Sequence, residues 1–287
     1  MKGGDAKRGS GLTPNKSRSR PCQGREVEWL TEVRAPDIVS NSMKAVILCA
    51  GVGGRLRPLT EDRPKCLVEV GGRTILESCL ANLEAGGIDE IVLVTGYKRE
   101  LVERLALNKC RTRVTFVQNE EYARTNTAVS LNLALKRMDS DFVLVNGDIL
   151  FDRGILDDLL RDPARNCLAV DPDAALDGEE VKVIVRDGRV EKIGKDADPA
   201  RSLGEAIGLN KIGRHLVPEL IAIYDGLEGR GELGHYFEKG FDVICVRGWA
   251  NGRAFGVCLT GRRPWVEIDT LEDYEYAVRE IAPRLGR

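Results

Sequence analysis

The chain has 287 residues, of which 43% are hydrophobic and 31% charged, the balance of an ordinary soluble globular protein. Its net charge of −2 argues against a nucleic-acid-binding protein, because such proteins usually carry a basic field that releases counterions. No apolar run approaches the roughly twenty residues of a membrane span and no signal-peptide core follows the first Met, so we expect a cytoplasmic protein without a membrane span.

The first 42 residues differ in composition from the rest of the chain. They contain eight Lys/Arg against five Asp/Glu and are rich in Gly, Ser, Pro and Asn. Such segments rarely bury enough apolar surface to offset the entropy cost of ordering. We therefore expect a flexible N-terminal extension over residues 1–42 and one folded domain over residues 43–287.

Expected strands and helices alternate from Lys44 to about residue 145. Continuous apolar runs predict buried parallel strands at 44–49, 91–95, 114–117 and 142–145. Helical spacing predicts helices at 74–86, 98–105 and 126–138, the first of them opening with the capping box of Thr74 and Glu77. This alternation predicts a doubly wound, mostly parallel α/β sheet, Rossmann-like and GT-A-like, with ligands at the carboxyl ends of the strands.

The second half changes character, because antiparallel strands are expected to join the sheet. Residues 181–193 alternate around Asp187-Gly188, which is a strong hairpin signal. Helical and apolar patterns then predict strands at 206–212, 243–246 and 265–268 and helices at 216–224, 231–237 and from about 271. We expect one mixed α/β domain with an antiparallel insertion in its second half.

The segment Ala50–Leu67 reads AGVGGRLRPLTEDRPKCL and follows the first expected strand directly. Gly-rich segments after a strand usually bind phosphate, because bare backbone N–H groups can approach an anion closely. A dinucleotide-binding G-x-G-x-x-G starting at Gly51 would need its third glycine at Leu56, and a P-loop would need its second at Leu56, Pro58 or Leu59. Both motifs fail, so the segment indicates another kind of phosphate site.

The remaining pattern is Gly51-x-Gly53-x-Arg55-Leu-x-Pro, followed by Pro-Lys65-x-Leu67. It resembles the signature of the nucleotidyltransferases, which activate sugar 1-phosphates and phospho-alcohols with nucleoside triphosphates. The resemblance implies that Arg55 neutralises the departing pyrophosphate and that Lys65 contacts phosphoryl oxygens at the reacting centre. It also implies that the nucleotide lies against the end of the first strand and the glycine backbone, at Leu48, Ala50, Gly51, Gly53 and Gly54.

The chemistry of such a transfer suits this composition. Attack of a phosphate oxygen on an α-phosphorus brings two anions together and expels a third, so fixed cations and N–H dipoles are the main requirement. Phosphate and phosphonate monoesters are already ionised near pH 7, so the nucleophile needs no dedicated general base. A chain with only two histidines and no visible catalytic triad can therefore be an enzyme. The alternative to a phosphate-binding role for the segment Ala50–Leu67 is a basic surface loop that binds no ligand.

Two aspartates directly follow expected strands and are candidates for a magnesium site. Asp148 ends the run Val143-Leu-Val-Asn-Gly-Asp, and Asp269 ends Trp265-Val-Glu-Ile-Asp. A Mg²⁺ ion that bridges triphosphate oxygens takes only one or two protein carboxylates, and the resemblance implies that these two ligate it. The alternative for Asp269 is a helix N-cap, a role that Thr270 could also take.

Other metal and transferase sites are disfavoured. The eight cysteines form no C-x-x-C pair and lie at no zinc-ligand spacing from a His, so we expect reduced, mostly buried thiols. A GT-A glycosyltransferase would need an acid at Leu150 to complete its D-x-D motif.

Polar residues after the third expected strand are candidates for base and ribose binding. Asn119 follows that strand, and Asn126-Thr127-Ala-Val-Ser130 opens the next helix. Sugar-phosphate members of the family typically show Gly-Thr-Ala here, so Asn126 replaces their glycine and is more similar to the branch that uses CTP. The resemblance implies that Asn119, Asn126, Thr127 and Ser130 lie near the nucleotide. A helix cap at Thr125 or Asn126 is the alternative.

The acceptor side is predicted from weaker patterns. The run Glu205-Ala-Ile-Gly208 resembles the phosphonate-handling members, which implies that Glu205 and Gly208, together with Glu267, contact the acceptor. Aromatic side chains could form a cage for choline. The candidates for its walls are Trp249, Phe255 and Trp265.

These patterns predict a Mg²⁺-dependent cytidylyltransferase. It would join CTP, or another NTP, to a small phosphate- or phosphonate-bearing alcohol or amine of the choline phosphate, inositol 1-phosphate or aminoethylphosphonate type, and release pyrophosphate. One alternative is a sugar-1-phosphate nucleotidyltransferase that uses UTP or dTTP, and another is a non-catalytic nucleotide-sensing subunit. We expect no nucleic-acid partner, and the sequence leaves a homo-oligomer open.

Overall fold

The computed structural model describes residues 42–176, 178–248 and 252–285. The predicted extension lies outside the described residues apart from Ser42, and so does Trp249. Within these three ranges, no helix combines the length and the apolar character that crossing a membrane requires.

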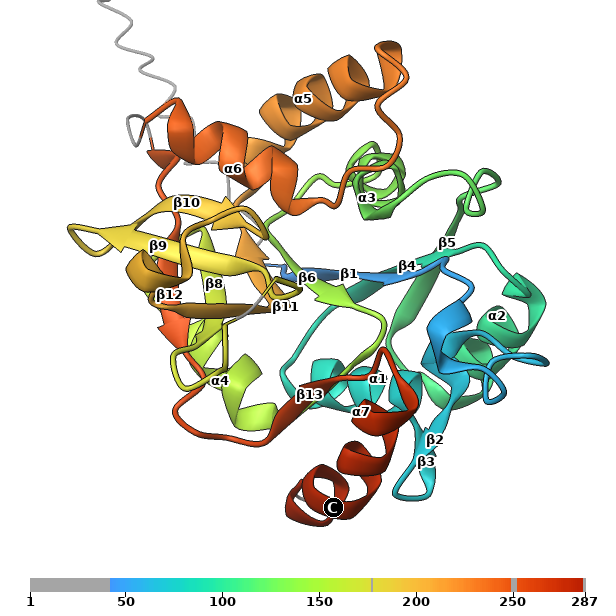
Figure 1. The fold of residues 1–287 in the computed structure, drawn as a ribbon. Helices are drawn as coiled ribbons and strands as arrows, with labels where there is room; N and C mark the ends of the chain where they lie inside the picture. Colours follow the sequence, from blue (N-terminus) through green and yellow to red (C-terminus); the bar gives the residue numbers. More distant parts are fainter. Residues whose placement is uncertain (1–41, 177, 249–251, 286–287) are drawn as a thin grey trace, which may run out of the picture. The chain divides into compact units, whose positions relative to one another are not determined.

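The central sheet has the strand order β10-β9-β11-β6-β1-β4-β5 (Figure 1). Leu48 pairs with Val94 on one side and with Asn146 on the other, so the carboxyl ends of three parallel strands meet at one edge of the sheet. The strands of this parallel set are β1 (Lys44–Cys49), β4 (Glu90–Thr95), β5 (Arg113–Gln118) and β6 (Phe142–Asn146).

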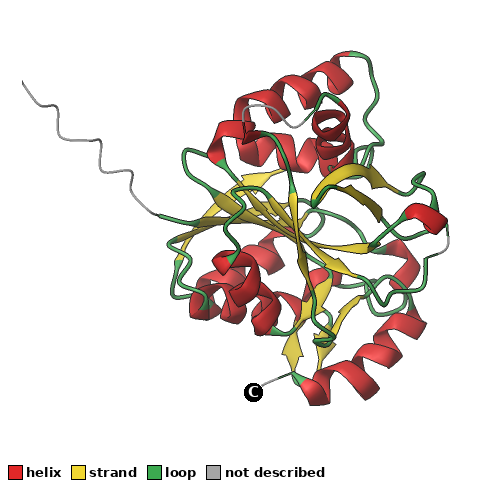
Figure 2. Cartoon of the chain, turned by 90° about the vertical axis from the view of Figure 1, so that its left-hand side faces the viewer, coloured by secondary structure: helices red, strands yellow, loops and turns green. Residues whose placement is uncertain are grey.

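Helices cover both faces of the sheet (Figures 1 and 2). Alternate residues of β1 pack into opposite layers: Val46 and Leu48 lie in one core, and Ala45 and Ile47 lie in the other. The first layer contains α3 (Thr127–Leu135), α5 (Val217–Gly229) and α6 (Glu238–Val246), and the second contains α1 (Ile75–Ala85), α2 (Arg99–Lys109) and α4 (Arg153–Arg161).

The order of the parallel strands reverses next to β1. From β1 the chain proceeds through β4 to β5 on one side, and β6 then returns to the other side of β1. Open α/β sheets bind ligands at such a reversal, outside the carboxyl ends of the strands. The predicted doubly wound, mostly parallel fold is confirmed, and the loop Ala50–Leu67 leaves the sheet at this point.

Antiparallel strands extend the sheet beyond β6, so the predicted insertion in the second half is also confirmed. Strand β11 (Gly204–Ile212) pairs antiparallel with β6, and β9 (Lys182–Arg186) forms a hairpin with β10 (Arg189–Gly194). Asp187 and Gly188 at its turn both have positive φ, 51° and 73°, which suits the right-handed twist of the two strands. Strands β8 (Cys167–Asp171) and β12 (Gly256–Leu259) pair with each other in parallel.

Short elements complete the described chain. Strand β7 (Ile149–Phe151) pairs antiparallel with β13 (Trp265–Glu267), which leads into α7 (Leu271–Tyr276). A small hairpin of β2 (Glu69–Val70) and β3 (Arg73–Thr74) precedes α1, whose predicted capping box at Thr74 is present. The seven cysteines in the described ranges are free, as expected, and all but Cys110 are buried.

One predicted strand is wrong, because residues 243–246 belong to helix α6, and the helix predicted at 231–237 begins only at Glu238. The buried positions Phe241, Ile244 and Cys245 recur at helical spacing, and Val246 points outward with 72% of its surface exposed. A run of four apolar residues cannot by itself distinguish a strand from a helix. The patterns also missed β7, α4, β8 and β12.

Candidate active site

The two arms of the loop Ala50–Leu67 are in direct contact. Gly53 has φ 68°, and a Cβ at this position would lie 2.8 Å from the Cβ of Lys65, so glycine lets the arms approach. The Thr60 hydroxyl donates a hydrogen bond of 2.8 Å to the carbonyl of Gly53. Leu56 between them is fully buried and anchors the loop. The loop therefore presents Arg55 and Lys65 from a fixed backbone.

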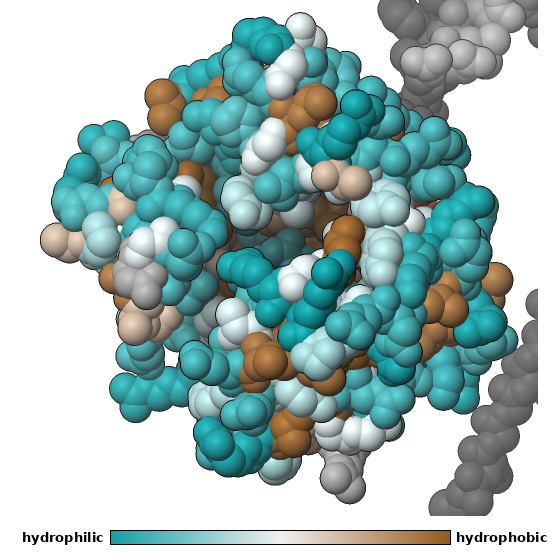
Figure 3. Space-filling view, turned by 45° about the vertical axis from the view of Figure 1, so that its right-hand side comes forward, coloured by the Kyte–Doolittle hydropathy of each residue, from teal (hydrophilic) through white to brown (hydrophobic). Residues whose placement is uncertain are grey.

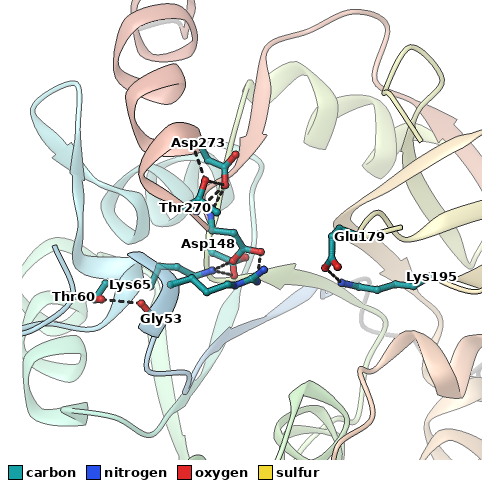
Figure 4. A network of polar contacts seen from close by, with 10 residues as sticks. Gly53, Thr60, Lys65, Asp148, Glu179, Lys195, Thr270 and Asp273 are labelled. Atoms are coloured by element: carbon teal, nitrogen blue, oxygen red, sulfur yellow. Dashed lines mark hydrogen bonds and ion pairs between the residues drawn. The ribbon is translucent and has the colours of Figure 1, made fainter. Parts of the chain in front are cut away.

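Lys65 is the centre of a charged cluster that joins three distant segments (Figure 4). Its Nζ lies 2.7 Å from Oδ2 of Asp148, after β6, and also donates a hydrogen bond to Oδ1 of Asp269, after β13. The other carboxylate oxygen of Asp269 lies 2.6 Å from a guanidinium nitrogen of Arg55. The structure thus brings together the four residues for which the sequence predicts catalytic or metal-binding roles.

The charges of this cluster stabilise one another. Burial lowers the pKa of Lys65, but Asp148 and Asp269 raise it by more, so the net pKa lies well above its ordinary value. Burial raises the pKa of Asp269, and the neighbouring Lys65 and Arg55 lower it below its ordinary value. Lys65 is therefore a cation and Asp269 an anion at neutral pH.

A third carboxylate, Glu267, lies beside the two aspartates. Ligand oxygens of Asp148, Glu267 and Asp269 all lie within 4.8 Å of one another. Burial, followed by the charges of Asp148 and Asp269, raises the pKa of Glu267 well above its ordinary value. Within the described ranges, Oδ1 of Asp148 is buried without a hydrogen-bond partner. Three oxygen donors with an unsatisfied carboxylate oxygen fit a hard divalent cation such as Mg²⁺.

The cap of α7 is formed by Thr270. Its side chain accepts a hydrogen bond from the backbone N–H of Asp273, and the Asp273 carboxylate accepts one from the backbone N–H of Thr270. The backbone N–H of Asp269 also donates to the Asp273 carboxylate, at 3.0 Å. The Asp269 carboxylate is therefore not the N-cap and faces Lys65 and Arg55.

Two glycines allow the turn that carries Asp148. The backbone N–H of Gly147 donates to the carbonyl of Leu48, and a Cβ here would lie 2.4 Å from that oxygen. Gly208 of β11 has φ 74°, and a Cβ there would lie 2.6 Å from Nδ2 of Asn146. Gly208, predicted to contact the acceptor, thus lies directly beneath the Asn146-Gly-Asp148 turn.

The polar residues predicted to lie near the base and ribose divide into two hydrogen-bonded groups. Asn119 is buried and donates to the hydroxyls of Thr125 and Ser130, both at 3.0 Å. Asn126 caps α3 by accepting from the N–H of Thr127, whose hydroxyl accepts from the backbone N–H of Phe237. The helix-cap alternative for Asn126 is therefore realised, which is compatible with binding.

Two charged residues opposite the Lys65 cluster, Lys195 and Glu179, were missed by the sequence patterns. Lys195 lies in the turn after β10, 3.3 Å from Glu179, and this pair points toward the Lys65 cluster from the opposite side (Figure 4). Its charge contributes to the lowered pKa of Asp269. The charge of Glu205, which was predicted to contact the acceptor, contributes to the raised pKa of Glu267. A lone lysine after a hairpin has no sequence signature that marks it as functional.

Of the three candidate walls of an aromatic cage, the structure describes Phe255 and Trp265. Phe255 is fully buried in the core under α6. Trp265 donates its indole N–H to Oδ2 of Asp171 at 2.6 Å. The face toward which the carboxyl ends of β1 and β4 point is hollowed near its centre, and hydrophilic residues surround much of the hollow (Figure 3).

Comparison with known proteins places this geometry in context. Residues 44–166 match the family model described as Nucleotidyl transferase. The chain is 30% identical over 257 residues to CMP-5'-(3-aminopropyl)phosphonate synthase of Streptomyces rubellomurinus, an alignment that covers 86% of this chain and 40% of that protein. It is 27% identical over 261 residues to CTP:phosphoglutamine cytidylyltransferase of Campylobacter jejuni, covering 83% of this chain and all of that protein.

A third relative and a solved structure are also similar. Choline-phosphate cytidylyltransferase of Streptococcus pneumoniae is 37% identical over 119 residues, which cover 42% of this chain and 51% of that protein. The structure of the inositol-1-phosphate CTP transferase from T. maritima superimposes with a TM-score of 0.69 at 24% identity, covering 86% of this chain and 99% of that one. The alignments cover 40% of the aminopropylphosphonate synthase and 51% of the choline-phosphate cytidylyltransferase, but all of the phosphoglutamine cytidylyltransferase.

Proposed function

We propose that this chain, which belongs to the nucleotidyltransferase family, transfers CMP from CTP to a small phosphate- or phosphonate-bearing alcohol or amine and releases pyrophosphate. The observation that carries the proposal is the cluster in which Lys65 lies between Asp148 and Asp269, with Arg55 on the same Gly-rich loop. The enzyme class, nucleotidyltransferase, is that of the relatives.

In the proposed reaction, an oxygen of the acceptor forms a bond to the α-phosphorus of CTP, and the bond from that phosphorus to the β-bridging oxygen breaks. Negative charge accumulates on the phosphoryl oxygens and on the departing pyrophosphate. In this proposal Lys65 stabilises the charge on the phosphoryl oxygens and Arg55 stabilises the charge on the pyrophosphate. The backbone N–H groups of the loop bind the triphosphate. Because the attacking oxygen is already ionised near pH 7, no residue needs to remove a proton from it.

Magnesium would be held by Asp148 and Asp269, with Glu267 as a third oxygen donor. When bound there, Mg²⁺ supplies positive charge to the triphosphate oxygens. The role of the chain is to hold these carboxylates in reach of one another, through the turn at Gly147 and the cap at Thr270.

The choice of CTP is supported by two arguments. The names of three relatives refer to CMP, CTP or cytidylyl transfer. In addition, Asn126 replaces the glycine that is typical of sugar-phosphate members. Phosphonates are favoured among acceptors because the aminopropylphosphonate synthase matches over 86% of this chain.

The test is a matrix of the four NTPs against choline phosphate, inositol 1-phosphate, 2-aminoethylphosphonate and hexose 1-phosphates, with pyrophosphate release as the readout. We expect release with CTP and a phosphate or phosphonate acceptor, in the presence of Mg²⁺ and not with EDTA. Release with UTP or dTTP and a hexose 1-phosphate would replace the proposal by the sugar-nucleotide alternative. Binding of NTPs without release under every condition would favour the nucleotide-sensing subunit.

A further inference from the structure

Glu238, the first residue of α6, is a buried carboxylate that the proposed reaction does not use. Only 7% of its surface is exposed, and its Oε2 has no hydrogen-bond partner among the described residues. A carboxylate in the first turn interacts favourably with the helix dipole, but this interaction does not require burial. An unpartnered buried carboxylate is costly unless a cation or a hydrogen-bond donor reaches it.

The position of Glu238 is fixed by the backbone of the preceding residue. The N–H of Phe237 donates to the hydroxyl of Thr127, and its carbonyl accepts a hydrogen bond of 2.7 Å from the hydroxyl of Tyr224. Tyr224 in turn packs against Gly240, where a Cβ would lie 2.4 Å from the tyrosine oxygen. Glu238 is therefore held in its buried place from both sides of α6.

The surroundings of Glu238 connect it to the candidate active site. The charge of Lys195 lowers the pKa of the Glu238 carboxyl and the charge of Asp148 raises it, so both residues act on this group. Lys195 does not neutralise it fully, because Lys195 is bonded to Glu179 and lies 5.1 Å from the ring centroid of Tyr236. This region thus combines the Lys195 cation, the Oε2 of Glu238 that lacks a hydrogen-bond donor, and the ring of Tyr236.

We propose that Glu238 binds a primary ammonium group at the far end of the acceptor, so that the substrate is an amine-bearing phosphonate or phosphate. The inference rests on the proposed function and specifies its substrate class. A primary ammonium carries three N–H donors, one of which satisfies Oε2 of Glu238, whereas a quaternary ammonium carries none. The anionic end of such a molecule faces Lys195 and the reacting cluster.

The experiment measures binding, which does not depend on turnover. 2-Aminoethylphosphonate and ethylphosphonate, which differ only in the amino group, are titrated calorimetrically into the full chain with and without CMP. We expect the amine to strengthen binding by about 30-fold or more, as for other pairs of buried opposite charges. The choline analogue with a trimethylammonium group is expected to bind more weakly than the primary amine.

The matched variants are Glu238→Gln, which keeps the shape and removes the charge, and Glu275→Gln on the exposed side of α7. We expect the preference for the amine to disappear in Glu238→Gln and to persist in Glu275→Gln. Glu238→Asp and the unfolding midpoint of each variant show whether a loss comes from the fold. Equal binding of both phosphonates to the unaltered chain, or an equal loss for both in Glu238→Gln, overturns the inference.

The same measurements separate this inference from the proposed function. A preference for the amine without any pyrophosphate release supports the ammonium site while contradicting the transferase proposal. Release of pyrophosphate with ethylphosphonate as readily as with 2-aminoethylphosphonate supports the transferase and overturns the ammonium site.

Discussion

The two halves of the domain place their charged groups in different ways. In the first half, Asn119 and Asp148 follow the parallel strands β5 and β6, and Arg55 and Lys65 lie on the loop after β1. In the second half, Gly208 lies inside a strand where the pairing with β8 shifts register, Lys195 follows a hairpin and Glu238 begins a helix. Apart from Asp269, the Lys65 cluster therefore follows from the register of parallel strands, whereas the proposed acceptor end depends on tertiary packing.

The largest effect is expected at the reacting end, where Lys65→Met keeps the length of the side chain and removes its charge. We expect kcat for pyrophosphate release to fall by about 10²–10³-fold, because the cation acts where phosphoryl charge develops. The matched control is Lys109→Met on the exposed side of α2, which should retain activity. Unchanged turnover in Lys65→Met would show that the reacting end lies elsewhere.

At the acceptor end, Glu238→Gln is expected to increase stability at high pH. Burial raises the pKa of Glu238 from 4.5 to about 7, and one pKa unit corresponds to about 1.4 kcal/mol. The folded state binds the proton of Glu238 more tightly than the unfolded state does. The stabilisation that this proton gives is therefore fully present below pH 4.5 and is lost as the pH rises through 7.

Urea unfolding at pH 5 and at pH 8 measures this effect. The free energy of unfolding of Glu238→Gln should exceed that of the unaltered chain by roughly 3 kcal/mol at pH 8 and by much less at pH 5. A difference that does not change with pH would mean that Glu238 is already paired in the folded protein.

The link between the two halves is Gly208, which lies beneath the turn that carries Asp148. Gly208→Ala combines a positive φ with a Cβ only 2.6 Å from Asn146. We expect Gly208→Ala to lower the free energy of unfolding by roughly 2 kcal/mol more than Gly87→Ala does. Gly87 also has a positive φ, but a Cβ there would meet no atom within 4 Å. Denaturant unfolding of both variants measures the difference, and equal losses would mean that the turn yields without cost.

The smallest effect compares two capping boxes, those of α1 and α7. Thr74→Ala removes the cap of α1 in the first half, and Thr270→Ala removes that of α7 beside Asp269. Each should cost about 1 kcal/mol of stability. Only Thr270→Ala should also lower kcat, because the Thr270 hydroxyl donates to the Asp273 carboxylate, which in turn accepts from the backbone N–H of Asp269. Parallel measurements of unfolding midpoint and turnover test this, and a comparable loss of activity in Thr74→Ala would contradict it.

The sequence predicts the first half of the fold and the convergence of its charges well. Buried apolar strands at 44–49, 91–95 and 142–145 are long enough to be recognised, and an aspartate after one strand must lie near a loop after its neighbour. Asp269 also follows an apolar strand, but β13 pairs antiparallel with β7 outside the parallel sheet, so its approach to Lys65 does not follow from the same register. Their catalytic and metal-binding roles stay predictions until the variants are measured.

The acceptor end could not be predicted in the same way. The run Val243–Val246 is too short to separate a strand from a helix, and α6 was therefore misassigned. Glu238 resembles an exposed acid at the start of a helix, and its burial depends on Thr127 and Tyr224, which come from other helices. Such contacts between distant segments leave no periodic pattern in a single sequence.

Strand β1 contributes side chains to both cores, and it is bonded to β4 and β6 along its length. Its amide hydrogens are therefore expected to exchange with solvent only through global unfolding, whereas those of the attached loop exchange through local opening. Hydrogen exchange should show an abrupt change in protection near Ala50. The slowest-exchanging backbone of the protein would then end where the loop that carries Arg55 and Lys65 begins.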